Sequence, residues 1–278
     1  MRPVSGHCKT TILLLPVRKH KMRFESYIPT EQLRPFVKAY TVIESEDEIT
    51  NRVLPGTSFA LAFRLRGKIS YLNDNNKIVL PTVAFSGLKK SARLINYAPH
   101  SAAIIVLFKE TGVSAFFKQP LHELFEQSVS LDNFFPLSEI SQVEERLAEN
   151  GSNTSKIAVI EQFLLSKIIY HNADRLISEA VAKIYSAKGN IRMKELSNDL
   201  FISQDAFEKR FRKITGATPK QFSHIVKLNA VISQSNKTVS LLDIVFENGF
   251  YDQPHFNKDF KIFTGQTPTD FFKSASYW

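Results

Sequence analysis

The chain has a single cysteine, Cys8, among its 278 residues. One thiol cannot form a disulfide within the chain, so a disulfide-stabilised scaffold is excluded. Long apolar runs are also lacking, because no stretch approaches the ~20 residues that a membrane-spanning helix needs. The apolar stretch 10–17 is short, and basic residues follow it instead of preceding it, which is the wrong order for a secretory signal. We therefore expect a cytoplasmic protein without a membrane segment.

The sequence lacks the usual motifs of catalytic and cofactor sites. No phosphate-binding glycine loop, nucleophile-elbow serine or carboxylate pair stands out. Between residues 38 and 168 the histidines are His100 and His122, without the closely spaced pair that a metal site would use. We expect no catalytic residues, no metal and no cofactor, and we interpret His100 as a turn residue.

Positive charge is distributed unevenly along the chain. The formal net charge is +9, with +5 in residues 1–30, zero in residues 31–173 and +4 in residues 174–278. A basic region fits a polyanionic partner. A merely soluble basic surface is also common, so the charge alone does not decide between these interpretations.

A segment near the C-terminus occurs twice. Residues 207–222 return as residues 256–271 at a constant offset of 49, with three aromatic or apolar positions, Thr-Gly and Thr-Pro kept in register. Short apolar segments at 193–202 and 241–250 precede the two copies. An internal repeat indicates one structural unit built twice, and two copies make a paired module rather than a solenoid.

Each copy contains a helix with readable ends. Its apolar residues are spaced i, i+4, i+7 and so share one stripe of a helix. Ser203 and Asp252 precede the two helices as expected N-caps, whereas Gly216 and Gly265 follow them where a positive φ is often needed.

A second helix begins directly after each of these stops. The Thr-Pro pairs at 218–219 and 267–268 supply an N-cap and a first helical residue. Gln221 completes a capping box with Thr218. A short helix, a turn, a longer helix and a new start predict a helix-turn-helix unit in each copy.

The exposed faces of the two repeated helices carry amide and charged side chains, which suit base edges and phosphates. One such helix alone is ordinarily a solvated amphipathic helix. The same face at the same place in two copies favours nucleic-acid binding. Residues 222–233 keep helical spacing between the copies, and a helix of ~14 residues is ~21 Å long. We expect this helix to hold the two exposed helices roughly 34 Å apart, which is one turn of B-DNA.

The second copy is similar to a known signature. Residues 249–261, GFYDQPHFNKDFK, followed by residues 263–268, FTGQTP, resemble closely the C-terminal signature of the AraC-type (AraC/XylS) bacterial transcription regulators. The resemblance covers about residues 174–273. It implies a seven-helix domain in which a central helix joins two helix-turn-helix units, and the second helix of each unit reads a major groove.

The resemblance also implies a set of DNA-binding residues. In the first unit they are Ser203, Gln204, Asp205, Glu208, Lys209 and Arg212, and in the second Asp252, Gln253, Pro254, His255, Asn257, Lys258 and Lys261.

This chain departs from the family pattern at several of these positions. Pro254 stands where a small polar residue is usual, although an early helical position tolerates proline. Phe201 replaces the more usual glycine of the first turn. Asp205 and Glu208 place two carboxylates on the first reading face, where they either accept hydrogen bonds from cytosine or weaken that unit's affinity.

The N-terminal half is predicted to be β-rich. Short β-branched and aromatic segments lie at 39–43, 59–63, 69–72, 77–80, 83–85, 92–97 and 102–108, separated by turn residues. They predict a sandwich or barrel. Helical spacing follows from Ser114, with a loop at 150–154. The family resemblance implies a cupin-like β-barrel with following helices, which binds an effector or mediates dimerisation. Phe59, Phe63 and Tyr71 are interpreted as core residues, with the lining of a pocket as the alternative.

We therefore predict an α+β protein of two domains. Residues 1–21 share no periodicity with the rest and are expected to form a disordered tail, with translation starting at Met1 or Met22. Residues 22–168 form the regulatory or dimerisation domain, and residues 174–278 form the AraC-type DNA-binding domain. A short linker at 169–174 joins them.

The leading functional hypothesis is a sequence-specific, non-enzymatic transcription regulator modulated by its N-terminal domain. Its expected partners are double-stranded DNA, RNA polymerase, a small-molecule effector of unknown type and a second copy of the chain. One alternative is an adaptor or anti-regulator whose repeat no longer binds DNA. Another is a repair enzyme with an attached DNA-binding module, for which Cys8 would be the nucleophile.

Overall fold

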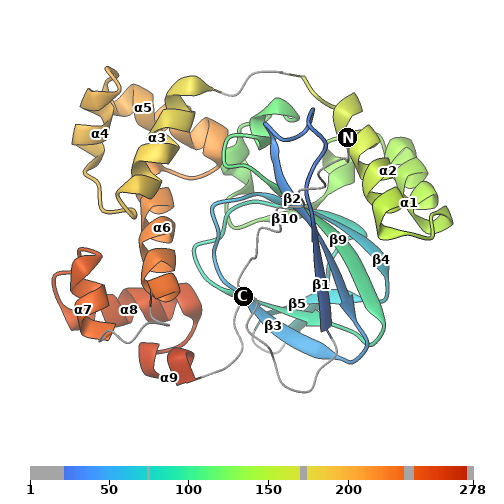
Figure 1. The fold of residues 1–278 in the computed structure, drawn as a ribbon, viewed down its shortest axis with the longest axis horizontal. Coiled ribbons are helices and arrows are strands. Elements are labelled where there is room, and N and C mark those ends of the chain that lie inside the picture. Colours follow the sequence, from blue (N-terminus) through green and yellow to red (C-terminus); the bar gives the residue numbers. More distant parts are fainter. Residues whose placement is uncertain (1–21, 74–75, 170–173, 235–240, 274–278) are drawn as a thin grey trace, which may run out of the picture.

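The computed structural model describes residues 22–73, 76–169, 174–234 and 241–273. The predicted tail 1–21, with Cys8, lies outside the described residues, as does most of the predicted linker 169–174. The predicted two-domain α+β class is confirmed: a β-rich N-terminal domain lies beside a helical C-terminal domain (Figure 1).

Two antiparallel sheets build the β-rich domain within the described residues. Sheet A has the order β1-β2-β9-β4-β7-β10, and sheet B has the order β3-β8-β5-β6. The strands are β1 (Met22–Tyr27), β2 (Val37–Ser45), β3 (Ile49–Val53), β4 (Ala60–Arg66), β5 (Ile69–Asn73), β6 (Asn76–Val79), β7 (Val83–Ser86), β8 (Arg93–Tyr97), β9 (Ser101–Phe108) and β10 (Ser128–Ser130).

Every predicted strand is present, but β1, β3 and β10 were not predicted. These three strands carry charged or hydroxyl side chains, which weaken the apolar pattern of a strand. β1 and β10 also lie at the edges of sheet A, where a strand has a neighbour on one side only. His100 stands in a turn with φ 57°, as predicted.

The core of the β-rich domain is aromatic. Phe59, Phe63, Phe85 and Phe108 are buried, and the ring of Phe85 stacks on Phe117 with centroids 4.5 Å apart. A smaller apolar cluster, which includes Ile43 of sheet A and Ile69 of sheet B, joins the two sheets. Offset or edge-on aromatic pairs of this kind fix the packing of a core more sharply than aliphatic contacts do.

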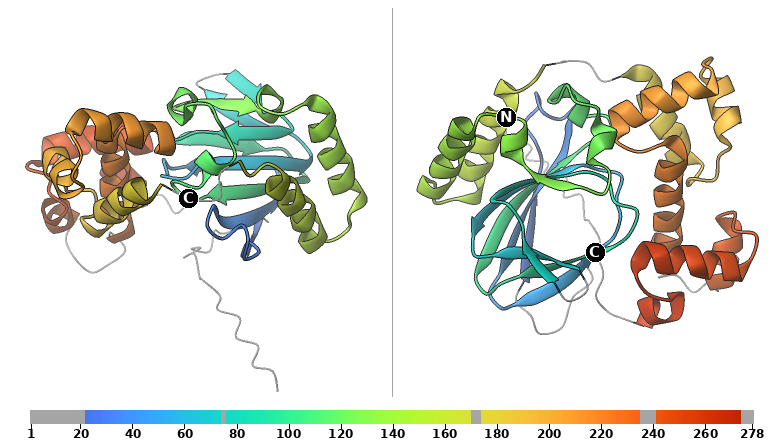
Figure 2. Two further views of the ribbon diagram at one scale, coloured as in Figure 1. Left: turned by 90° about the horizontal axis from the view of Figure 1, so that it is seen from above. Right: turned by 180° about the vertical axis from the view of Figure 1, so that it is seen from behind.

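Two helices cover sheet A on the side remote from the helical domain (Figures 1 and 2). They are α1 (Leu137–Glu149) and α2 (Asn153–Ser166). α2 begins within the predicted loop 150–154, because Ser152 accepts a hydrogen bond from the amide of Ser155 and caps the helix. Three 3₁₀ helices, η1 (Val113–Ala115), η2 (Leu121–Leu124) and η3 (Leu131–Asn133), connect β9 to this pair.

Seven helices form the described part of the C-terminal domain, as predicted. They are α3 (Arg175–Ser186), α4 (Met193–Asp199), α5 (Gln204–Thr215), α6 (Pro219–Gln234), α7 (Leu241–Glu247), α8 (Gln253–Thr264) and α9 (Pro268–Lys273). The pairs α4–α5 and α7–α8 lie at opposite ends of α6 (Figures 1 and 2). None of the helices in the described ranges combines the length and the apolar character of a membrane span.

Candidate nucleic-acid interface

The repeat in the sequence is a repeat in the aromatic core. In the first unit the ring centroids of Phe207 and Phe211 are 5.5 Å apart, and Phe211 lies 5.4 Å from Phe222. In the second unit the equivalent distances, from Phe256 to Phe260 and from Phe260 to Phe271, are both 5.2 Å. These rings anchor the buried sides of α5 and α8, so the opposite sides of both helices face solvent.

Both helices begin at the predicted N-caps. Ser203 accepts a hydrogen bond from the amide of Ala206 at 3.4 Å, and Asp252 accepts one from the amide of His255 at 2.7 Å. Each cap satisfies an amide that has no partner within its helix. Pro254 lies in the first turn of α8, where the missing N–H leaves no helical bond unmade.

Both helices end at the predicted glycines, which adopt the left-handed conformation. Gly216 has φ 77° and Gly265 has φ 76°. Their amides donate to the carbonyls of Arg212 and Lys261, at 3.0 and 2.8 Å. This is the C-terminal cap in which glycine avoids the strain of a Cβ atom.

The capping box predicted at the start of α6 is present in both directions. The Thr218 amide donates to Gln221 at 2.9 Å, and the Gln221 amide donates to Thr218 at 3.2 Å. The chain therefore enters the central helix at a fixed angle directly after the first unit.

All of the predicted DNA-binding residues are exposed, and they form two groups on α5, α8 and their N-caps. The first group is Ser203, Gln204, Asp205, Glu208, Lys209 and Arg212, and the second is Asp252, Gln253, Pro254, His255, Asn257, Lys258 and Lys261.

The face of α5 has mixed charge and is partly engaged within the chain. Asp205 and Glu208 stand beside Lys209 on its exposed side. Arg212, in the last turn, donates to Nε2 of His122 at 3.1 Å and is thereby drawn toward the β-rich domain. Arg210 pairs with Asp174, the N-cap of α3, at 2.7 Å. Two of the basic residues of α5 thus have partners inside the protein.

Beyond its N-cap Asp252, α8 has one acid, Asp259, and that acid has histidine neighbours. Oδ2 of Asp259 lies 3.4 Å from Nε2 of His255 and 3.9 Å from Nε2 of His224. The pKa of His224 lies below its ordinary value, because burial outweighs the opposite effect of the nearby Asp259. Lys258 and Lys261 remain exposed on the same helix, so the cations dominate the outward charge of α8.

The β-rich domain contacts the C-terminal end of each of these helices. Nη1 of Arg52, in β3, donates to the Thr264 carbonyl at 2.8 Å, and the Ala92 amide donates to the Phe263 carbonyl at 2.8 Å. These bonds satisfy carbonyls that the last turn of α8 leaves without helical partners, and the guanidinium lies where the helix dipole favours a cation.

The end of α5 is held in a comparable way. A Cβ atom at Gly216 would lie 2.4 Å from the Phe59 ring and 3.2 Å from the Leu121 carbonyl oxygen. The apolar core runs without a break from the β-rich domain through Phe59 and Leu121 to Ala217. Sequence reasoning missed these contacts, because no local pattern marks Arg52, Phe59 or Ala92 as partners of residues far along the chain.

Further hydrogen bonds join the two domains away from the exposed helices. Tyr185 of α3 donates to Glu110 at 2.7 Å, and Asn229 of α6 donates to the Pro55 carbonyl at 2.9 Å. Burial and the neighbouring Glu110 raise the pKa of Tyr185, which keeps its hydroxyl protonated.

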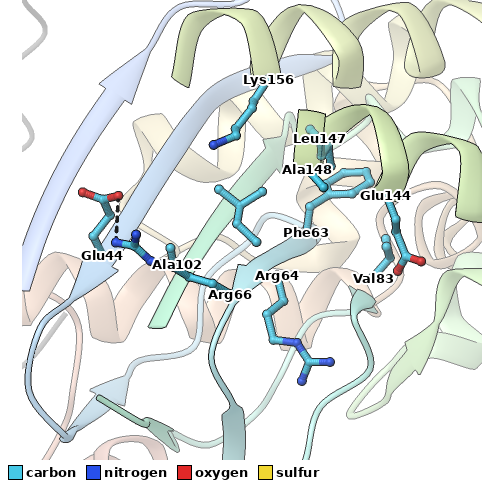
Figure 3. A pocket seen from close by; sticks show the side chains of 11 residues that line it. Glu44, Phe63, Arg64, Arg66, Val83, Ala102, Glu144, Leu147, Ala148 and Lys156 are labelled. Atoms are coloured by element: carbon cyan, nitrogen blue, oxygen red, sulfur yellow. Dashed lines mark hydrogen bonds and ion pairs between the residues drawn. The ribbon is translucent and has the colours of Figure 1, made fainter. Parts of the chain in front are cut away.

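A cavity of about 250 Å³ lies between sheet A and the α1–α2 pair (Figure 3). Apolar and charged side chains line it: Glu44, Phe63, Arg64, Leu65, Arg66, Val83, Ala102, Glu144, Leu147, Ala148 and Lys156. The predicted core residues Phe59 and Phe63 are both buried, and Phe63 also borders this cavity. No group of three or more potential metal ligands occurs in the described ranges.

Comparison with known proteins agrees with this geometry. Residues 196–274 match the family described as helix-turn-helix domain, and residues 25–130 match a domain of unknown function. The Msm operon regulatory protein of Streptococcus mutans serotype c is 27% identical over 157 residues, which is 54% of this chain and 55% of that protein. The chain thus matches about half the length of this curated relative.

Two solved structures are similar at low identity. ToxT from Vibrio cholerae is 10% identical with a TM-score of 0.47, covering 84% of this chain and 97% of that one. The AraC-like transcriptional activator CuxR is 10% identical with a TM-score of 0.32, covering 78% and 82%. Likeness at this level has no bearing on function.

The helix-turn-helix match spans the repeated units and their caps, and the signature at 249–268 lies on the turn, α8 and the start of α9. The C-terminal domain therefore contains a helix-turn-helix domain of the AraC type at residues 196–274, in agreement with the resemblance seen in the sequence.

Proposed function

We propose that the protein is a sequence-specific transcription regulator that reads two successive major grooves of DNA with α5 and α8. One observation carries this proposal: the two helices are built identically, with buried aromatic stripes, exposed N-terminal halves and one rod, α6, between them. The 16 residues of α6 span about 24 Å, a length suited to neighbouring grooves on one face of the duplex. The name of the streptococcal relative supports the regulatory role.

Binding to genomic DNA fragments tests the proposal. Fragments selected by the purified chain should bind it with an affinity that falls steeply with salt, because basic side chains displace counterions from phosphates. Lys258→Ala should weaken binding, whereas Lys38→Ala, at an exposed lysine of β2, should not. Failure of the chain to select any sequence would contradict the proposal.

The β-rich domain, on this proposal, governs the spacing of the two helices by holding their C-terminal ends. Arg52 and Ala92 bond to the end of α8, while Phe59 packs on the end of α5. Because one domain touches both ends, a displacement within it changes the position of one recognition helix relative to the other.

Arg52→Ala tests this control. The variant should discriminate less between DNA with the selected spacing of half-sites and DNA with that spacing altered by two base pairs. Arg23→Ala, at an arginine of β1 that pairs with Glu46, serves as the control. If Arg52→Ala and the unmodified chain discriminate equally between the two spacings, the β-rich domain does not govern the spacing of the two helices.

A small anionic effector fits the cavity beneath α1 and α2. Phe63 and Leu147 supply apolar lining, and Arg64 and Lys156 supply cationic lining (Figure 3). Strand β4 lines the cavity and follows Phe59 directly, so it links the cavity to the end of α5. A panel of short aliphatic carboxylates should raise the unfolding temperature of the protein but not that of Lys156→Ala.

An adaptor that does not bind DNA is the second candidate, and the carboxylates of Asp205 and Glu208 on α5 favour it. Phosphates repel these carboxylates unless cytosine amino groups donate hydrogen bonds to them. Retention on non-specific DNA at low salt distinguishes the two functions, because a regulator is retained and the adaptor is not.

A further inference from the structure

Two aromatic side chains project into solvent beside the N-terminal ends of the recognition helices. Phe201 is 98% exposed and Tyr251 is 94% exposed. They are the two most exposed large apolar side chains in the described residues, ahead of Ile28 and Leu137 at 65% each. Isolated exposed apolar residues are common, but these two lie in the corresponding turns of the two units, within two residues of the N-caps.

The two turns that carry these rings have the same backbone design. In the first, the Phe201 amide donates to Asn198 and the Ile202 amide donates to Ser197, at 3.0 and 3.1 Å. In the second, Gly249 and Phe250 make the corresponding bonds to Phe246 and Val245, at 2.9 and 3.2 Å. Phe201 therefore occupies the position of Gly249, while Tyr251 is the additional residue of the second turn.

The conformation of Phe201 is unfavourable in the free protein. Its φ is 53°, and the equivalent Gly249 has φ 77°. A residue with a Cβ atom is strained in this region, whereas glycine is not. The ring gains nothing from burial that would offset the strain, because almost all of its surface is in water. Such strain is typical of a residue that acts in recognition.

From this arrangement we infer that Phe201 and Tyr251 contact thymine methyl groups at the edges of the two major grooves. The inference rests on the proposed function. In helix-turn-helix proteins the N-terminal residues of the recognition helix contact base edges, so a side chain just before the N-cap lies at the mouth of the groove. The thymine methyl is the apolar group that base pairs present there.

The two rings differ in what else they can reach. The hydroxyl of Tyr251 can donate to a phosphate oxygen while its ring contacts a methyl group. Phe201 has no polar atom in its side chain and contributes apolar contact alone. Thymine preference is therefore stronger beside the first unit, whose helix face also carries the carboxylates Asp205 and Glu208.

The test uses the full chain and the DNA that it selects. Thymines are replaced by uracil in one half-site at a time, which removes methyl groups and leaves every hydrogen-bonding edge unchanged. Loss of one buried methyl should weaken binding by the unmodified protein about fourfold. Phe201→Gly should weaken binding to thymine DNA about tenfold. This variant should then bind thymine DNA and DNA with uracil in the half-site of the first unit with the same affinity. Tyr251→Phe, which keeps the ring, should still prefer thymine over uracil in the half-site of the second unit.

Folding is controlled within the same experiment. Phe201→Gly should unfold at the same or a higher temperature than the unmodified chain, because it relieves the left-handed strain. Ile28→Ala, at an exposed apolar residue of the other domain, should change neither binding nor methyl preference.

The outcomes separate this inference from the proposed function. If the unmodified chain binds no DNA, the proposed function fails, and the inference fails with it. If the chain binds DNA and Phe201→Gly binds it with the same affinity, the inference alone is overturned. The two rings would then be assigned to contact with a protein partner. A Phe201→Gly variant that still prefers thymine over uracil by the full factor also overturns it.

Discussion

The two helix-turn-helix units share a core and differ in their faces. Three aromatic rings of each core, the left-handed caps and the N-caps correspond one to one. Their outward charges do not: α5 presents Asp205 and Glu208, and its Arg212 is drawn to His122. Within α8 the one acid, Asp259, lies next to His224 and His255, whereas Lys258 and Lys261 are exposed.

This difference teaches that folding and recognition place separate demands on the same repeat. The stripe that packs must keep its volume, because cores tolerate few changes in size. The exposed stripe has no such constraint and can adapt to different bases. We therefore expect substitutions in the cores to have equal effects in both units, and substitutions on the faces to have unequal effects.

The largest effect is expected from removing a core ring. Phe211→Ala and Phe260→Ala should each lower the free energy of unfolding by about 3–5 kcal/mol, because each leaves a cavity between packed aromatic side chains. Chemical denaturation measures both, with hydrogen exchange to locate the loosened unit. A cost below about 1 kcal/mol for either ring would break the equivalence of the two cores.

The N-caps should differ modestly. Asp252→Ala should cost about 1–2 kcal/mol of stability, and Ser203→Ala should cost about 0.5–1 kcal/mol. The reason is geometric and electrostatic: the aspartate bond is 2.7 Å long and charged, whereas the serine bond is 3.4 Å long and neutral. Thermal unfolding of the two variants and of the exposed control Ser233→Ala measures the difference, and the reverse order would contradict it.

A lysine on each face tests recognition. Lys258→Ala should weaken binding to selected DNA about fivefold, reduce the salt slope by about 1 and affect all sequences similarly if it contacts phosphate. Lys209→Ala should have the smaller effect, because two carboxylates already reduce the positive potential of α5. Titrations at several salt concentrations give both quantities. Unchanged affinity and slope in Lys258→Ala would count against α8 as a reader.

The smallest effect is expected from neutralising the first face. Asp205→Asn with Glu208→Gln should strengthen non-specific binding about threefold at low salt, since two repulsions from phosphate disappear. The same variant should lose discrimination at cytosine-containing positions if these carboxylates accept from cytosine amino groups. Weaker non-specific binding would show that the carboxylates do not face DNA.

The local features of the helical domain could be predicted from the sequence because each depends on a few neighbouring residues. Ser203, Asp252 and the capping box of Thr218 and Gln221 act within one helical turn. The glycines at 216 and 265 were predictable since few other residues adopt their φ at low cost. The apolar periods of α5 and α8 likewise determined which sides are buried.

The rest could not be predicted because it depends on residues far apart in the chain. Apolar and polar residues alternate only weakly in strand β3. Its Arg52 donates a hydrogen bond to the carbonyl of Thr264, which is 212 positions away in the sequence. The cavity beneath α1 and α2 is defined by four strands and two helices that no periodicity brings together. The DNA-binding residues were predicted by resemblance and lie on exposed faces, but their contacts with bases stay a prediction.

Hydroxyl-radical and methylation footprinting of the full chain on selected DNA tests the central claim most directly. Two protected major-groove segments are expected on one face of the duplex, with centres about 10 base pairs apart. A single protected segment, or two segments on opposite faces of the duplex, would contradict it.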